Sequence, residues 1–158
     1  MKCFEIAKRE QSDLIYFVED DYLHYDNSLV DMLDTYERIS SQHKDEIIVC
    51  PSDYPFNYMT NEKTNILIGS QQHWRIITKM LCTFMISKKM FQKHINNFEK
   101  TCEKRHDPFE KYLNEILQKE IAISPIKSLA IHLTNVNSSY GLSPFMDYKK
   151  LWDENKVK

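Results

Sequence analysis

The segment from Leu14 to His24, LIYFVEDDYLH, constrains the fold more than any other part of the chain. It begins with an unbroken run of aliphatic and aromatic residues and continues directly into Glu19, Asp20 and Asp21. An apolar run without polar alternation is typical of a strand covered on both faces, and such strands belong mostly to parallel sheets with helices on each side. In open α/β sheets the ligand lies at the carboxyl ends of the strands, so we expect the three carboxylates at a binding site.

Three consecutive carboxylates repel one another unless a cation or several hydrogen-bond donors compensate their charge. A divalent metal ion is the simplest partner, because carboxylate oxygens are the ligands that Mg²⁺ and Mn²⁺ prefer. The sequence therefore predicts a divalent metal site at Glu19, Asp20 and Asp21. The alternative is that these residues only end a strand and begin a solvated turn.

The apolar spacing in the rest of the chain predicts alternating strands and helices in one α/β domain, residues 1–158. A helix that begins after Asp26 or Asn27 and a strand over 46–50 would complete a βαβ unit with the first strand. The loop 51–61 then leaves the second strand at the same edge as the carboxylates. Further expected elements are a helix over 2–11, strands over 64–69, 73–78, 81–86, 121–124 and 128–133, and helices beginning at Ser87, at Asp107 and near Tyr148.

Composition excludes several classes of function. The net charge of −2, from 21 basic and 23 acidic residues, gives no general attraction to nucleic acid, and no stretch is long enough for a transmembrane helix. The N-terminus, MKCFEIAKREQ, carries charges where a signal peptide needs an apolar core, and the four cysteines are scattered, so we expect a cytoplasmic protein with reduced thiols. With only 2 glycines the chain has neither a Walker loop nor a dinucleotide fingerprint.

Four blocks of the sequence occur together in one known family. They are YFVEDDYLH (Tyr16–His24), HWR (His73–Arg75), DPFE (Asp107–Glu110), and His132 followed by LSPFMDY (Leu142–Tyr148). In content and order they resemble a family of glycosyltransferase-like proteins with the GT-A fold, which use nucleotide sugars. The resemblance covers nearly the whole chain and implies a partial GT-A fold, a Rossmann-like mixed sheet flanked by helices.

The resemblance implies a metal-dependent glycosyltransferase, or its catalytic half, that moves a sugar from a nucleotide-sugar donor to a glycan hydroxyl. Asp21 matches the last carboxylate of the acidic motif, which binds Mn²⁺ or Mg²⁺ between the two donor phosphates. Glu19 or Asp20 would order the ribose or a metal-bound water. His132 matches the late histidine that can complete the shell of the metal, with Asn135 as the alternative at that place.

The same resemblance implies residues for the transfer step. Asp107 matches the carboxylate that takes the proton from the attacking hydroxyl, although Asp107 fits equally well as a helix cap. Arg75 would contact a phosphate or an acceptor carboxylate, and Trp74 would offer a flat face to a sugar ring. The alternative is that Trp74 and Arg75 form the core and the rim of a hairpin.

Complete GT-A domains have a nucleotide-binding half before the acidic motif, and here only residues 1–13 precede the first strand. The resemblance therefore implies an N-terminally truncated domain with an open sheet edge, which would associate with a second copy or with a partner chain. Two competing functions remain. One is a non-catalytic binding or assembly module, and the other is a metal-dependent phosphoesterase that uses the three acidic residues and His132.

Overall fold

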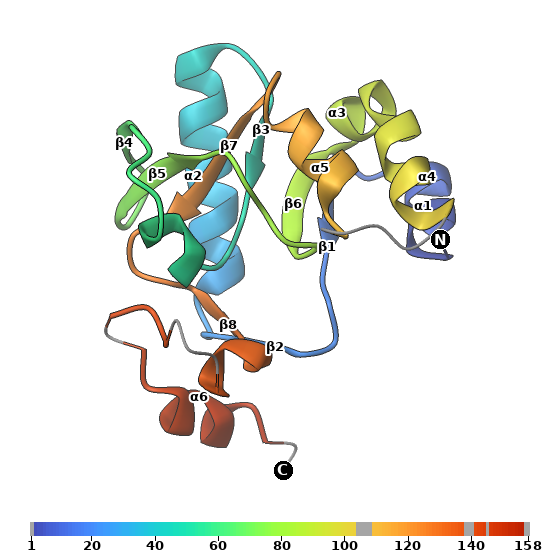
Figure 1. Cartoon of the computed structure of the whole chain (residues 1–158). Helices are drawn as coiled ribbons and strands as arrows, with labels where there is room; N and C mark the ends of the chain where they lie inside the picture. Colours follow the sequence, from blue (N-terminus) through green and yellow to red (C-terminus); the bar gives the residue numbers. More distant parts are fainter. Residues whose placement is uncertain (1, 104–108, 138–140, 145, 157–158) are drawn as a thin grey trace.

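The computed structural model describes residues 2–103, 109–137, 141–144 and 146–156 (Figure 1). In these residues the chain forms a six-stranded mixed sheet flanked by helices and a separate two-stranded ribbon, which confirms the expected α/β class. The strands are β1 (Leu14–Phe17), β2 (Tyr22–His24), β3 (Ile47–Val49), β4 (Ile66–Ile68), β5 (His73–Ile77), β6 (Phe84–Ser87), β7 (Ile121–Pro125) and β8 (Ala130–His132). The helices are α1 (Lys2–Arg9), α2 (Ser28–His43), α3 (Lys88–Lys93), α4 (Ile95–Glu103), α5 (Lys111–Ile116) and α6 (Tyr148–Glu154), with short 3₁₀ helices at η1 (Pro55–Tyr58) and η2 (Leu133–Asn137).

The strand order of the large sheet is β1-β6-β3-β7-β5-β4. In the described sheet β3 and β7 are the one parallel pair, and the other neighbours are antiparallel. It follows that β1, β3 and β7 point the same way and end at the same side of the sheet. The acidic residues after β1 and the loop 51–61 after β3 therefore share that side, as the sequence predicted.

The position of β1 corrects one expectation. β1 is an edge strand and runs antiparallel to β6, with Leu14 opposite Ser87 and Phe17 opposite Phe84, whereas the sequence predicted a strand inside a parallel sheet. Both faces of β1 are nevertheless partly covered, because Phe17 and Tyr16 pack into two different core clusters. Two covered faces produce the same unbroken apolar run at an edge as at the centre of a sheet. The βαβ unit is also interrupted, since β6 lies between β1 and β3.

Two apolar clusters form the core, one on each face of the sheet. On one face, rings from α1, β1, β6, α3 and α4 pack edge-to-face and tilted against one another: Phe4, Phe17, Phe84, Phe91 and Phe98. On the other face, Met32 and Ile39 of α2 pack with Trp74 and Ile123 of the sheet. Figure 1 shows α2 alone on its side of the sheet and α1, α3 and α4 grouped together on the other.

Several local predictions are confirmed. β4 and β5 form the expected antiparallel hairpin, and the side chain of Ser87 accepts a hydrogen bond from the Met90 N–H at 3.0 Å, which caps α3. Asp147 caps α6 in the same way, at the predicted place in the tail. In the described part of the chain, no helix has the length and apolar character needed to cross a membrane.

Candidate functional site

The ribbon of β2 and β8 brings Asp21 next to His132. β2 pairs antiparallel with β8 so that Tyr22 lies opposite His132, and the Leu133 N–H donates to the Asp21 carbonyl at 2.9 Å. In this register the Asp21 Oδ2 lies 2.8 Å from the His132 Nε2. The two residues that the resemblance assigned to one metal ion are therefore side by side, at the end of the sheet where β1 and β3 finish.

Neighbouring side chains hold the His132 ring in place. The ring stacks on Tyr22, with centroids 4.8 Å apart and planes at 11°, and the Tyr22 hydroxyl lies 3.1 Å from the Tyr54 hydroxyl. The Thr134 hydroxyl lies 3.4 Å from the Asp21 Oδ2 and 3.3 Å from the His132 Nε2. The side chains of Asp21 and His132 are 40% and 18% exposed, so the pair is fixed in position but open to a ligand.

The three consecutive carboxylates have different surroundings. Asp21 contacts His132, Asp20 is exposed, and Glu19 is half-buried, with its backbone N–H bonded to the Thr83 hydroxyl at 3.0 Å. Burial is the main cause that raises the pKa of Glu19; Asp21 and Glu110 add to this effect and His132 opposes it. The mutual repulsion that suggested a shared cation is thus reduced by the pairing of Asp21 with His132, although Asp21 and Glu19 still interact.

Titration of Glu19 by NMR is expected to give a pKa above its ordinary value of 4.5. The folded state then binds the proton more tightly than the unfolded state. The contribution of Glu19 to the free energy of unfolding is therefore lost as the pH rises through the folded pKa. Glu19→Gln is therefore expected to raise the free energy of unfolding at neutral pH, with a gain that shrinks as the pH falls towards 4.5. Asp21→Asn should lower the pKa of Glu19, whereas Asp26→Asn, an exposed control, should not. An unshifted Glu19 would contradict its half-buried position.

No group of three or more His, Cys, Asp or Glu side chains among the described residues is arranged to hold a metal ion. Asp21 and His132 form a pair of possible ligands, and a metal ion between them would replace their direct contact. The candidate base, Asp107, lies outside the described residues. Nearby Glu110 is described and precedes α5, but its side chain makes no capping hydrogen bond.

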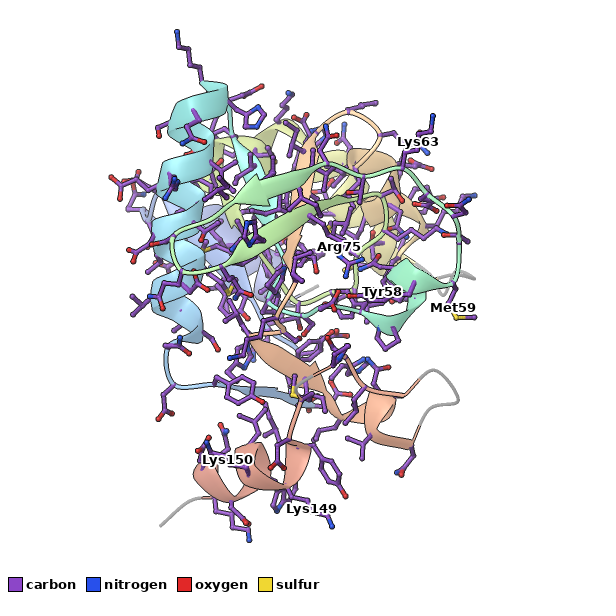
Figure 2. All side chains as sticks on the ribbon, turned by 90° about the vertical axis from the view of Figure 1, so that its left-hand side faces the viewer. Tyr58, Met59, Lys63, Arg75, Lys149 and Lys150 are labelled. Atoms are coloured by element: carbon purple, nitrogen blue, oxygen red, sulfur yellow. The ribbon has the colours of Figure 1, made fainter. Side chains whose placement is uncertain are left out.

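Arg75 is already engaged by other residues of the chain. Its Nη2 lies 2.5 Å from the Asp53 Oδ1 in a buried ion pair, and its guanidinium lies over the Tyr58 ring at 4.2 Å (Figure 2). The Ser143 hydroxyl donates to the Asp53 Oδ2 at 2.8 Å, and the Tyr58 hydroxyl contacts both Asp53 and Arg75. The expected contact of Arg75 with a phosphate does not fit this position, because Asp53 already takes the place of the anion.

Asp53 is the residue that the sequence analysis missed. It lies in the loop after β3, at the same end of the sheet as the acidic segment, and its backbone N–H donates to the Ser128 hydroxyl at 2.9 Å. Through Arg75, Ser128 and Ser143 it connects β5, the segment before β8 and the segment before α6. The one indication in the sequence was that Asp53 lies in the loop 51–61, which was predicted to share an edge of the sheet with the acidic residues. Its partners could not be identified, because they lie far away in the sequence.

Trp74 is fully buried, at 0% exposure, in the cluster beneath α2. Its ring therefore offers no face to a sugar, and the hairpin-core alternative describes it better. Gly69 makes the space for the indole, because the turn from Gly69 to Gln72 brings the backbone against the ring. A methyl group at Gly69 would overlap the indole.

Gly69→Ala is consequently expected to destabilise the fold by about 1–3 kcal/mol, the usual cost of overpacking a filled core. Chemical denaturation followed by tryptophan fluorescence measures this directly, since the overlap is with Trp74 itself. Ser41→Ala on the exposed side of α2 is a suitable control and should change the free energy of unfolding by less than about 0.5 kcal/mol. Equal stability of the two variants would show that the indole can move aside.

Comparisons with protein-family models, with curated proteins and with solved structures gave no match for this chain. Its function therefore has to be inferred from its own residues and their arrangement.

Proposed function

We propose that this chain is a metal-dependent glycosyltransferase, or its catalytic half, with a GT-A fold, which moves a sugar from a nucleotide-sugar donor to a glycan hydroxyl. One observation carries the proposal: Asp21 and His132, from the first and the last of the sequence blocks, lie 2.8 Å apart at the ligand side of the sheet. Each of the two residues matches a metal-binding position of the family. The mixed sheet flanked by helices agrees with the proposal at a coarser level.

The donor set at this site suits Mn²⁺ better than Mg²⁺, because an imidazole nitrogen is a good ligand for transition metals and a poor one for Mg²⁺. Asp21 and His132 would hold the ion, and when bound it would neutralise charge on the departing nucleoside diphosphate. Two ligands from the chain leave the other positions to phosphate oxygens and water. We therefore expect the metal and the nucleotide to bind together and each to bind weakly alone.

The other residues of the acidic segment have separate roles in the proposal. Exposed Asp20 is available to the ribose hydroxyls of the donor, and Glu19 lies close enough to His132 for the imidazole to oppose the rise in the pKa of Glu19. Asp107 stays the proposed base that takes the proton from the acceptor hydroxyl. Arg75 is assigned to the buried pair with Asp53 and supports the loop after β3 instead of contacting the donor.

Isothermal titration calorimetry with Mn²⁺ and a panel of UDP-, GDP- and CMP-sugars tests the proposal. The expected result is binding of one nucleotide class that requires Mn²⁺, and little heat from Mn²⁺ alone. Glycan transfer by the chain, alone or with a partner chain, would then be assayed with that donor. Asp107→Asn is expected to leave donor binding unchanged and to impair transfer.

Two other outcomes would select the competing functions. Absence of heat at millimolar donor, with and without Mn²⁺, would favour a non-catalytic binding module. That outcome has some structural support, because Asp21 and His132 already satisfy each other by direct contact. Release of phosphate from a nucleoside diphosphate without any acceptor would indicate a phosphoesterase.

A further inference from the structure

A polar cavity lies at the opposite end of the β2–β8 ribbon from Asp21. Its volume is about 410 Å³, and its lining comes from α2, the turn between β4 and β5, the segment between β7 and β8, and the start of α6. The charged and polar residues of the lining include Tyr25, Asp31, Gln72, Lys127, Asp147 and Lys150. Neither Asp21 nor His132 lines this cavity, so it is separate from the candidate metal site.

Asp31 is the most unusual group in the lining. It is 1% exposed, yet in the described residues its carboxylate takes part in no ion pair. It accepts one hydrogen bond from the Thr35 hydroxyl at 3.1 Å and one from the Gln72 Nε2 at 2.9 Å. An ionised carboxylate can accept about four hydrogen bonds. Burying a carboxylate costs free energy unless donors satisfy it, so Asp31 has capacity for further donors from the cavity.

The hydrogen bonds around Asp31 fix the shape of the cavity. The Gln72 Oε1 accepts a hydrogen bond from the Lys127 N–H at 2.9 Å, and the Thr35 hydroxyl accepts one from the Ser70 N–H at 3.0 Å. Through these contacts α2, the turn before β5 and the segment after β7 are tied together. A ligand would therefore meet polar groups that are already in position, which lowers the entropy cost of binding.

We propose that this cavity binds an uncharged saccharide. Its two carboxylates, Asp31 and Asp147, accept hydrogen bonds, its two lysines donate them, and its amide side chains do both, which matches the paired donors and acceptors of sugar hydroxyls. Tyr25 adds an aromatic ring to the lining. The equal numbers of acidic and basic residues disfavour a strongly anionic or cationic ligand. The saccharide site rests on the proposed function and extends it, because a transferase needs a place for its glycan acceptor. Binding of a saccharide can be measured without any assay of sugar transfer.

Lys150 and Lys149 provide a matched pair of variants on α6. Lys150 lines the cavity, whereas Lys149 does not, and Figure 2 shows the two lysines on different sides of the helix. Lys150 contacts Glu154 at 3.7 Å on the surface, so its replacement by alanine should not disturb the core. Gln72→Ala removes a donor to Asp31 and provides a second, more central variant.

Titration of the ¹⁵N-labelled chain with lactose, maltose and diacetylchitobiose tests the inference by NMR. At least one disaccharide is expected to cause saturable shifts of the backbone amides of residues 71, 72 and 127. Lys150→Ala and Gln72→Ala should each weaken binding by about tenfold, the effect of one lost hydrogen bond, and Lys149→Ala by less than about twofold. If Gln72→Ala does not fold, the two lysine variants still decide the question.

Parallel titrations with inorganic phosphate and with spermine test the charge of the ligand. Shifts of the same amides by phosphate or spermine, without any by the three disaccharides, would overturn the saccharide assignment, and so would the absence of shifts from every probe. Asp21→Asn should leave saccharide binding unchanged. Loss of nucleotide binding in that variant would therefore be distinguishable from failure of the saccharide site.

Discussion

Arg75→Met is expected to lower the free energy of unfolding by about 3–5 kcal/mol, because it leaves Asp53 buried without its cation. The side chain of Asp53 is 0% exposed and that of Arg75 is 10% exposed, so water cannot replace the lost partner. Methionine keeps much of the volume of the arginine stem, so the loss reports mainly the uncompensated charge. Urea denaturation followed by circular dichroism measures the difference.

Two further variants separate charge from packing. Adding Asp53→Leu to Arg75→Met is expected to recover much of the lost stability, since replacing both members of a buried pair by apolar residues is often close to neutral. Lys8→Ala breaks the surface contacts of Lys8 with Glu5 and Glu99 and should lower the free energy of unfolding far less than Arg75→Met, because exposed ion pairs contribute little. If Arg75→Met costs no more than Lys8→Ala, the buried pair does not stabilise the loop after β3.

Asp21→Asn is expected to reduce Mn²⁺-dependent nucleotide binding by about a hundredfold or more, to below detection in calorimetry. Asparagine has the shape of aspartate but lacks the negative charge that a cation requires. Asp21 is 40% exposed in its contact with His132, so the free energy of unfolding should change by less than about 1 kcal/mol. A thermal melt of the same sample shows whether the loss of binding is separate from a loss of fold.

Asp26→Asn is the control for the second prediction. Asp26 is exposed and follows β2 at the end of the ribbon opposite to the Tyr22–His132 pair. The Asp26→Asn variant removes one negative charge, as Asp21→Asn does, but at the other end of the ribbon, and should leave nucleotide binding unchanged. Equal nucleotide affinity of Asp21→Asn and the wild type would contradict the assignment of Asp21 as a metal ligand. An equal loss of nucleotide affinity in Asp21→Asn and Asp26→Asn would indicate a general effect of net charge.

The local structure was predictable where neighbours in the sequence determine it. α2 follows from apolar residues at helical spacing, and Ser87 caps α3 through a contact only three residues away. The hairpin of β4 and β5 also depends on a short turn. The position of β1 could not be predicted in this way, because β6, its partner, follows about 70 residues later and an apolar run does not indicate which strand pairs with it.

In the candidate site, too, local features were predictable and contacts between distant segments were not. The acidic segment and its end of the sheet were predictable from an apolar run followed by carboxylates. The contact of Asp21 with His132 needed the resemblance, since the ribbon that joins them combines segments from the two ends of the chain. Asp53 was missed because its pairing with Arg75 and Ser143 depends on how three separate segments pack. The resemblance assigned Trp74 to a sugar ring. Its burial could not be predicted, because the space for the indole depends on Gly69 and on the folded turn around it.

The ribbon of β2 and β8 also sets a distance. Its ladder continues from the Leu133–Asp21 hydrogen bond at one end to the Tyr25–Leu129 hydrogen bond at the other. At about 3.4 Å per residue, the four steps from Asp21 to Tyr25 span about 14 Å. If the cavity beside Tyr25 holds the acceptor and Asp21 holds the donor metal, as proposed, a single sugar is too short to extend from one to the other, and the acceptor would be an oligosaccharide. The length of the ribbon would then set the minimum chain length of the glycans that can bind at both places.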